Sequence, residues 1–145
     1  MKPGDLRAEI YKKHIQGRLM AVSFITVGEL LFGAKRKKWG AAKLADLNQR
    51  LRSVVIVPYD REVCATYADL KVRVQTIGRP VADNDLWIAA CAVRHQIPLV
   101  SNNRDHYAHI PGLILISEAA AIEEAKAQQS LPLGDQSSGG PSEPT

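Results

Sequence analysis

Cysteine and long apolar runs are both scarce in this sequence. Its two cysteines, Cys64 and Cys91, form no Cys-x-x-Cys pair, which excludes a disulfide framework, and we expect both thiols to be buried. Every apolar run is far shorter than the roughly 20 residues that cross a bilayer. The start lacks the charged, apolar and cleavage regions of a secretory signal. We therefore expect a cytoplasmic protein.

The familiar motifs of nucleotide binding and of serine catalysis are also absent. The 145 residues contain no P-loop, no GxGxxG fingerprint and no GxSxG elbow. A chain of this length builds one compact domain. Any chemistry therefore depends on polar residues in another pattern.

Positive charge is distributed unevenly. The net charge is +4, but residues 118–145 hold five acidic residues and one lysine and sum to −4, so residues 1–117 carry +8. A basic body attracts polyanions such as RNA or DNA, although solubility is an alternative explanation. The candidate phosphate contacts form one basic run, which comprises Lys35, Arg36, Lys37 and Lys38. The alternative interpretation is that this run is the solvated end of a helix.

Short apolar runs alternate with helical patterns along the chain. This order predicts an α/β fold with a mostly parallel sheet covered by helices on both faces. We expect residues 1–120 to form the domain, residues 121–130 to end its last helix, and residues 131–145, rich in Pro, Gly and Ser, to be a disordered tail. The predicted strands are 18–25, 53–58, 97–101 and 113–117, and the predicted helices are 3–16, 26–38, 41–52, 61–78, 86–96 and 118–129.

Acidic and amide side chains follow the predicted strands or open the next helix. Glu29 lies just after the first strand, and Asp85 shares a helical stripe with apolar residues. Asn103 and Asp105 follow the third strand, with Asn102 before them. Each of these residues also has an explanation that involves no function. Glu29 is then an exposed residue in a first helical turn, and Asp85 is one acid more than a helix start needs, since Asp83 suffices. Asn103 and Asp105 are then residues favoured in turns for backbone reasons. Together, at one edge of a parallel sheet, they favour Mg²⁺ or Mn²⁺ and phosphodiester hydrolysis.

Three stretches in this order resemble the PIN-domain family, and within it the VapC-type toxin ribonucleases of bacterial toxin–antitoxin pairs. They are "AVSFITVGELLFGA", "GRPVADNDLWIAACAV" and "PLVSNNRDHYAHIPGL", and the likeness covers roughly residues 5–117. The resemblance implies a PIN-like three-layer sandwich and an RNA-cleaving site that holds Mg²⁺ or Mn²⁺. It assigns Glu29 and Asp85 to that site, with Asn103 or Asp105 as the further polar position; the predicted metal ligands are Glu29, Asp85 and Asp105. It also implies an RNA substrate, with tRNA as one candidate, a cognate antitoxin and a homodimer.

One departure from the family pattern affects both the sheet and the site. The family opens with a strand of the type "LLDTN", whose Asp binds metal, and this chain opens with "MKPGDLRAEIYKKHIQGR", in which Asp5 does not match that Asp. Loss of a central strand leaves two neighbouring strands without ladder partners and exposes apolar faces. Two explanations fit the departure: the protein begins upstream of this sequence, or the chain is a degenerate copy of a toxin. The corresponding functions are a metal-dependent endoribonuclease toxin, or an inactive truncated toxin that binds antitoxin or a sibling toxin. A receiver-like signalling domain lacks the residues that it requires.

Overall fold

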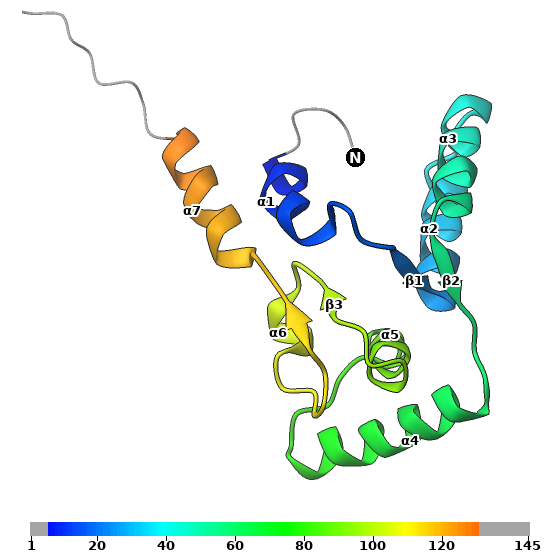
Figure 1. The fold of residues 1–145 in the computed structure, drawn as a ribbon, viewed down its shortest axis with the longest axis vertical. Helices are drawn as coiled ribbons and strands as arrows, with labels where there is room; N and C mark the ends of the chain where they lie inside the picture. The colour runs from blue at the N-terminus through cyan, green and yellow to red at the C-terminus, as the bar shows by residue number, and fades with distance from the viewer. Residues whose placement is uncertain (1–5, 131–145) are drawn as a thin grey trace, which may run out of the picture.

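The computed structural model describes residues 6–130, and the predictions for residues 3–5 and for the tail at 131–145 lie outside them. Helices and strands alternate along the described part of the chain (Figure 1). The helices are α1 (Leu6–Ile15), α2 (Phe24–Arg36), α3 (Ala41–Arg52), α4 (Arg61–Thr76), α5 (Asp83–Arg94), α6 (Arg104–Tyr107) and α7 (Ala119–Ser130). The strands are β1 (Ala21–Ser23), β2 (Val55–Val57), β3 (Leu99–Val100) and β4 (Leu115–Ile116).

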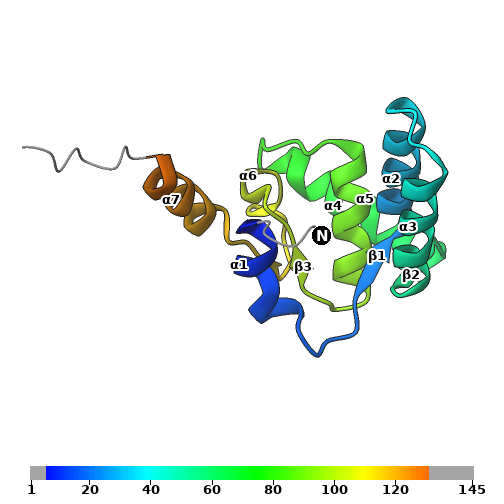
Figure 2. The ribbon, with the colours of Figure 1, turned by 90° about the horizontal axis from the view of Figure 1, so that it is seen from above.

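The strands form two separate parallel pairs. β1 pairs with β2, and Ala21 lies opposite Val55. β3 pairs with β4, and Leu99 lies opposite Leu115. Figures 1 and 2 show β1, β2, α2 and α3 on one side of the molecule and α1, α6, α7 and β3 on the other. The parallel pairing is confirmed, and among residues 6–130 the strands form two separate pairs rather than one continuous sheet.

Helices α4 and α5 supply the core that joins the two halves. Their buried side chains include Val63, Leu70 and Leu86, which are at most 3% exposed. These residues belong to one cluster with Val57 of β2, and Leu99 of β3 packs against the same cluster. The core therefore fixes both strand pairs relative to α5, which carries Asp85.

Capping residues decide where two helices begin. The Asp60 carboxylate accepts a hydrogen bond from the Val63 N–H at 2.7 Å, which confirms Asp60 as the cap of α4. The Ser23 hydroxyl accepts one from the Thr26 N–H at 3.1 Å, so α2 begins at Phe24. The predicted strand 18–25 is consequently cut to three residues, because Ser23 ends it and caps the next helix.

Helices α1 and α7 are joined through Tyr11 and Glu118. The Tyr11 hydroxyl donates to the Ser101 carbonyl at 3.2 Å and accepts from the Glu118 N–H at 2.9 Å. Lys13 Nζ and His14 Nε2 lie 2.8 and 2.6 Å from Glu118 Oε1. These contacts attach the first helix to the end of β3 and to the start of α7.

Candidate functional site

The Asp85 carboxylate is held by two residues of the segment after β3. The Tyr107 hydroxyl donates to Asp85 Oδ1 at 2.8 Å, and His106 Nδ1 lies 2.8 Å from Asp85 Oδ2. The Asp85 side chain is 21% exposed, whereas Tyr107 is 4% exposed. Asp85 is thus fixed at the surface by a buried donor behind it and by a solvent-facing imidazole.

Glu29 meets the first turn of the same helix. Asn84 Nδ2 donates to Glu29 Oε1 at 3.0 Å, across 55 residues of sequence. Glu29 lies in the second turn of α2, directly after β1, and Asn84 precedes Asp85 in α5. The carboxylates of Glu29 and Asp85 are therefore brought to the same end of α5.

The pKa of the Tyr107 hydroxyl is affected by the carboxylates of both Asp85 and Glu29. Burial raises its pKa above the usual value of 10, and the hydrogen bond to Asp85 raises it further. The negative charges of Asp85 and Glu29 add to the same effect. Tyr107 consequently remains a protonated donor across the physiological range.

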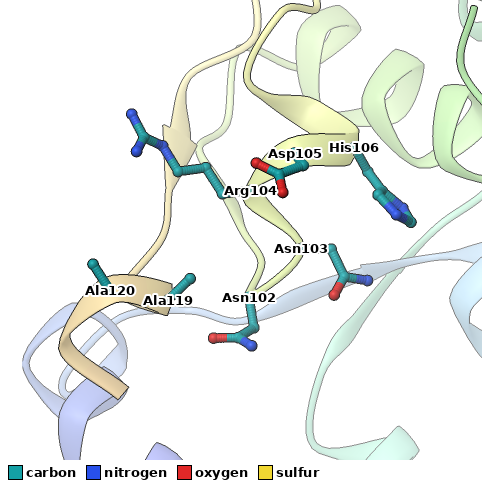
Figure 3. A pocket seen from close by; sticks show the side chains of 7 residues that line it. All are labelled: Asn102, Asn103, Arg104, Asp105, His106, Ala119 and Ala120. Carbon is teal, nitrogen blue, oxygen red and sulfur yellow. The ribbon is translucent and has the colours of Figure 1, made fainter. Parts of the chain in front are cut away.

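The polar residues after β3 surround a separate shallow pocket. Asn102, Asn103 and Asp105 line about 330 Å³ between α6 and the start of α7 (Figure 3). Asn103 precedes the first residue of α6, and its N–H donates to Ser101 Oγ at 3.1 Å. Glu29 and Asp85 do not line this pocket. The choice between Asn103 and Asp105 as the further site residue stays open.

A complete metal cage is not formed by the described side chains. Within residues 6–130, no group of three or more His, Cys, Asp or Glu side chains is placed to hold a metal ion. Glu29 and Asp85 meet through neighbours, and Asp105 lies with the pocket residues of α6. The metal site at Glu29, Asp85 and Asp105 thus remains a prediction.

Asp83 does not cap α5, so the sequence-based interpretation of Asp83 as the capping residue of this helix is wrong. Ala82 occupies the cap position, and Asp83 is the first helical residue. Its carboxylate accepts hydrogen bonds from Lys71 Nζ and the Tyr67 hydroxyl, each at 2.9 Å. The hydrogen bond from Lys71, followed by that from Tyr67, lowers the pKa of Asp83. Asp83 therefore ties α5 to α4, which leaves Asp85 as the acid that faces α6.

The predicted phosphate contacts lie at the far end of α2. Lys35 and Arg36 end the helix, and Lys37 and Lys38 follow with exposed side chains. Eight residues of helix separate Glu29 from Lys37, a rise of about 12 Å. The role of this run as phosphate contacts remains a prediction.

Two partners of the acids were missed by sequence reasoning. Tyr107 resembles a core aromatic in sequence, and its ring is buried in the core while its hydroxyl reaches Asp85. Asn84 lies between Asp83 and Asp85, and its position in the sequence does not reveal its hydrogen bond to Glu29. His106 Nδ1 lies 2.8 Å from Asp85 Oδ2, and His109 Nε2 lies 3.2 Å from the Arg79 carbonyl oxygen. Only pairing across the fold distinguishes these roles, and no local pattern carries that signal.

Comparisons with known proteins identify the family of this chain. The PIN domain family profile matches residues 4–113. Ribonuclease VapC2 of Haemophilus influenzae is 31% identical over 94 residues, which cover 65% of this chain and 71% of that protein. The tRNA(fMet)-specific endonuclease VapC of Shigella flexneri is 26% identical over 112 residues, or 77% and 83% of the two chains.

A solved structure agrees with the fold. VapBC2 from Rickettsia felis, bound to a DNA fragment from the promoter, superposes with a TM-score of 0.66 at 27% identity, over 77% of this chain and 81% of that one. The fold is accordingly a PIN-like α/β sandwich. The chain belongs to the PIN-domain family, in its VapC-type toxin branch.

Proposed function

We propose that this chain is an endoribonuclease toxin of a toxin–antitoxin pair, with Glu29 and Asp85 as its acidic site residues. The observation that carries the proposal is their meeting at the first turn of α5, beside the buried hydroxyl of Tyr107. Two carboxylates held at the edge of a parallel sheet, on a basic body, suit phosphodiester hydrolysis. The VapC ribonucleases similar to this chain support the same activity.

We also propose Mg²⁺ or Mn²⁺ as the cofactor. Carboxylate oxygens are hard ligands, and Mg²⁺ is commonly bound by one or two carboxylates together with water and substrate phosphate oxygens. Glu29 and Asp85 fit that description, with Asp105 as a third acid from α6. A bound ion would supply charge stabilisation and activated water. The chain itself orients the carboxylates, through Asn84 at Glu29 and through Tyr107 at Asp85.

RNA cleavage with purified protein tests the activity. We expect cleavage of bulk tRNA in Mg²⁺ or Mn²⁺ and its loss in EDTA. Asp85→Asn should lower the rate by about a hundredfold or more, the scale seen when one electrostatic catalytic group is removed. The matched control is Asp83→Asn, two residues away on the same helix and paired with Lys71. Cleavage by Asp85→Asn at the unmutated rate would remove Asp85 from the site.

We further propose an antitoxin partner. The similar protein of Rickettsia felis was solved as the VapBC2 complex. On α2, the apolar side chains of Leu30 and Leu31 are 41% and 38% exposed, and they form a small apolar surface that suits a protein partner. An assembly of two copies is the alternative use of this surface. Sedimentation of the chain alone and with a candidate VapB-like antitoxin distinguishes the two.

An inactive binding protein is the second candidate function, favoured by the incomplete metal cage among the described residues. It predicts a stable antitoxin complex and no RNA cleavage at high Mn²⁺. Cleavage that Asp85→Asn abolishes would contradict it.

A further inference from the structure

The connection between α2 and α3 concentrates the positive charge of the molecule. Residues 35–43, here called the basic tip, hold five basic residues and no acidic one, a charge of +5 within nine residues. The other described residues hold thirteen basic and twelve acidic residues, which sum to +1. Figures 1 and 2 both show α2 and α3 side by side at one margin of the molecule. The five basic residues of the tip are Lys35, Arg36, Lys37, Lys38 and Lys43.

The basic side chains of the tip have no acidic partner within residues 6–130. All five are exposed, and none of them takes part in an ion pair there. Asp46, the acid nearest to the tip in sequence, is already paired with Arg50 Nε at 2.9 Å. The described part of the chain therefore leaves the charge of the tip without a neutralising group.

Helix electrostatics explains only part of this charge. Lys35 and Arg36 lie in the last turn of α2, where the helix dipole favours a cation. Lys43 lies in the first turn of α3, where the dipole disfavours a cation and where no acid is present. Lys38 has a φ of +50°, in the left-handed region that glycine occupies after α4 at Gly78. Because Lys38 and Lys43 both cost stability at these positions, their presence favours a role in binding.

Backbone hydrogen bonds hold the tip in one conformation. The Lys38 N–H donates to the Lys35 carbonyl at 3.0 Å, and the Trp39 N–H donates to the Ala34 carbonyl at 3.0 Å. This pair of bonds closes the carboxyl end of α2 and reverses the chain toward α3. The position of the lysines at the turn is consequently fixed by the fold.

Two of the basic side chains are also ordered by aromatic rings. Arg36 Cζ lies 5.7 Å from the centroid of the Phe32 ring, and Lys43 Nζ lies 6.0 Å from the centroid of the Trp39 ring. Such cation–π contacts restrain a long side chain and leave its charge open to solvent. A polyanion that binds the tip therefore loses less side-chain entropy than it would on unrestrained lysines.

The tip is separated from the acids by most of α2. The rise from Glu29 to Lys37 is about 12 Å, which exceeds the screening length of about 8 Å at physiological ionic strength. The charge of the tip therefore contributes little at a bond that is cleaved beside Glu29 and Asp85. A ligand of the tip is affected in its binding rather than in the chemical step.

We propose that the basic tip anchors the RNA substrate by its phosphate backbone, away from the cleaved bond, without metal and without reading base sequence. Lysine and arginine side chains only donate hydrogen bonds, which suits phosphate oxygens. Lys43, which the sequence-based prediction omitted, belongs to this site together with the run at 35–38. The choice of RNA rests on the proposed ribonuclease function, because the charge alone recognises any polymer of phosphodiesters.

Binding of unfractionated tRNA to the full chain in EDTA tests the anchor without cleavage. The variant is Lys37→Gln with Lys38→Gly, in which glycine suits the left-handed backbone. The matched control, Arg73→Gln with Arg94→Gln, removes the same charge from exposed arginines outside the tip. We expect the tip variant to bind at least about tenfold more weakly and to lower the slope of log K against log salt by about 1.5. Equal weakening by the control would assign binding to net charge and overturn the site.

Single substitutions on α3 test the residue that extends the site. Lys43→Gln should weaken tRNA binding severalfold and leave stability unchanged or higher, because it removes a cation from the first turn of α3. Arg52→Gln, at the other end of the same helix, is the matched control and should bind as the unmutated chain does. Tip-dependent binding that is stronger for duplex DNA or for polyglutamate than for tRNA would assign the tip to DNA or to an acidic protein, and would overturn the proposal.

Cleavage kinetics in Mg²⁺ or Mn²⁺ separates the anchor from the acids. The tip variant should raise KM at unchanged kcat, the pattern of lost uniform binding, whereas Asp85→Asn should lower kcat. A lowered kcat at unchanged KM in the tip variant would place the tip in the chemical step and overturn the proposal. Tip-dependent tRNA binding by a chain that never cleaves would support the anchor and contradict the ribonuclease function. Cleavage with an unaltered KM in the tip variant would do the reverse.

Discussion

The core between α4 and α5 and the groove of about 680 Å³ lined by β1, β3, α1 and α5 are built from similar apolar residues, yet they differ in exposure. Val63, Leu70 and Leu86 in the core are 0%, 3% and 1% exposed. Met20 and Val100 at the groove are 36% and 37% exposed. Hydrophobic sequence alone therefore does not determine burial; a strand also needs partners for its edges and faces. The acids Glu29 and Asp85 belong to neither region and meet at the start of α5.

The largest contrast should come from side-chain truncation. Leu86→Ala leaves a cavity in the closed core, and we expect a loss of about 2–5 kcal/mol in the free energy of unfolding. Val100→Ala removes methyl groups that already contact solvent, and we expect a loss below about 1 kcal/mol. Urea unfolding of the two variants measures the difference. Equal losses would mean that the groove is as tightly packed as the core.

The next contrast concerns the two residues that hold Asp85. Tyr107→Phe removes a buried hydrogen bond to a carboxylate and should cost about 1–3 kcal/mol. His106 is 57% exposed, so His106→Ala should cost less than about 1 kcal/mol. Denaturant midpoints compare them. A larger loss for His106→Ala would place the main support of Asp85 at the surface.

A smaller effect is expected at the cap of α4. Asp60→Ala removes the acceptor for the Val63 N–H and should destabilise the core by about 1 kcal/mol. Asp60→Asn keeps an acceptor oxygen and serves as the matched control. Thermal unfolding of both variants measures the contribution of the cap to stability. If Asp60→Asn melts at a temperature as low as that of Asp60→Ala, the charge of Asp60 rather than its capping hydrogen bond is responsible.

The smallest effect should be the pH response of the α1–α7 junction. Hydrogen bonds from His14 first, and then Lys13, lower the pKa of Glu118 below 4.5. A lowered pKa means that this stabilisation is complete above pH 4.5 and is lost as the pH falls through the folded-state value. We expect amide exchange at Glu118 to accelerate there relative to α4. Glu118→Gln should remove the response, and its persistence would assign it to another group.

The sequence predicted elements best where local signals suffice. The helix at 41–52 matches α3, and Asp60 caps α4 as expected. The predicted strand at 97–101 shrank to Leu99–Val100, because strand length depends on pairing that the residues themselves do not encode. The one-turn helix α6 was not predicted, since four residues are too few to show a period.

The site was only partly readable in the sequence. Glu29 and Asp85 were expected at one edge, and the structure brings both to the first turn of α5. The role of Tyr107 depends on a contact across 22 residues, and that of Asn84 on one across 55. Such contacts are set by packing of α2, α5 and α6, so spacing within a motif does not reveal them.

Amide hydrogen exchange along β1 and β3 tests the open sheet most directly. The account predicts alternation: slow exchange for Leu99 and Ser101, whose N–H groups donate toward the β4 side, and fast exchange for Val100 between them. On β1, Val22 should be protected and Ala21 should not. Protection of Val100 equal to that of Leu99 and Ser101 in the isolated monomer would contradict the account, because the edge of β3 would then already be paired.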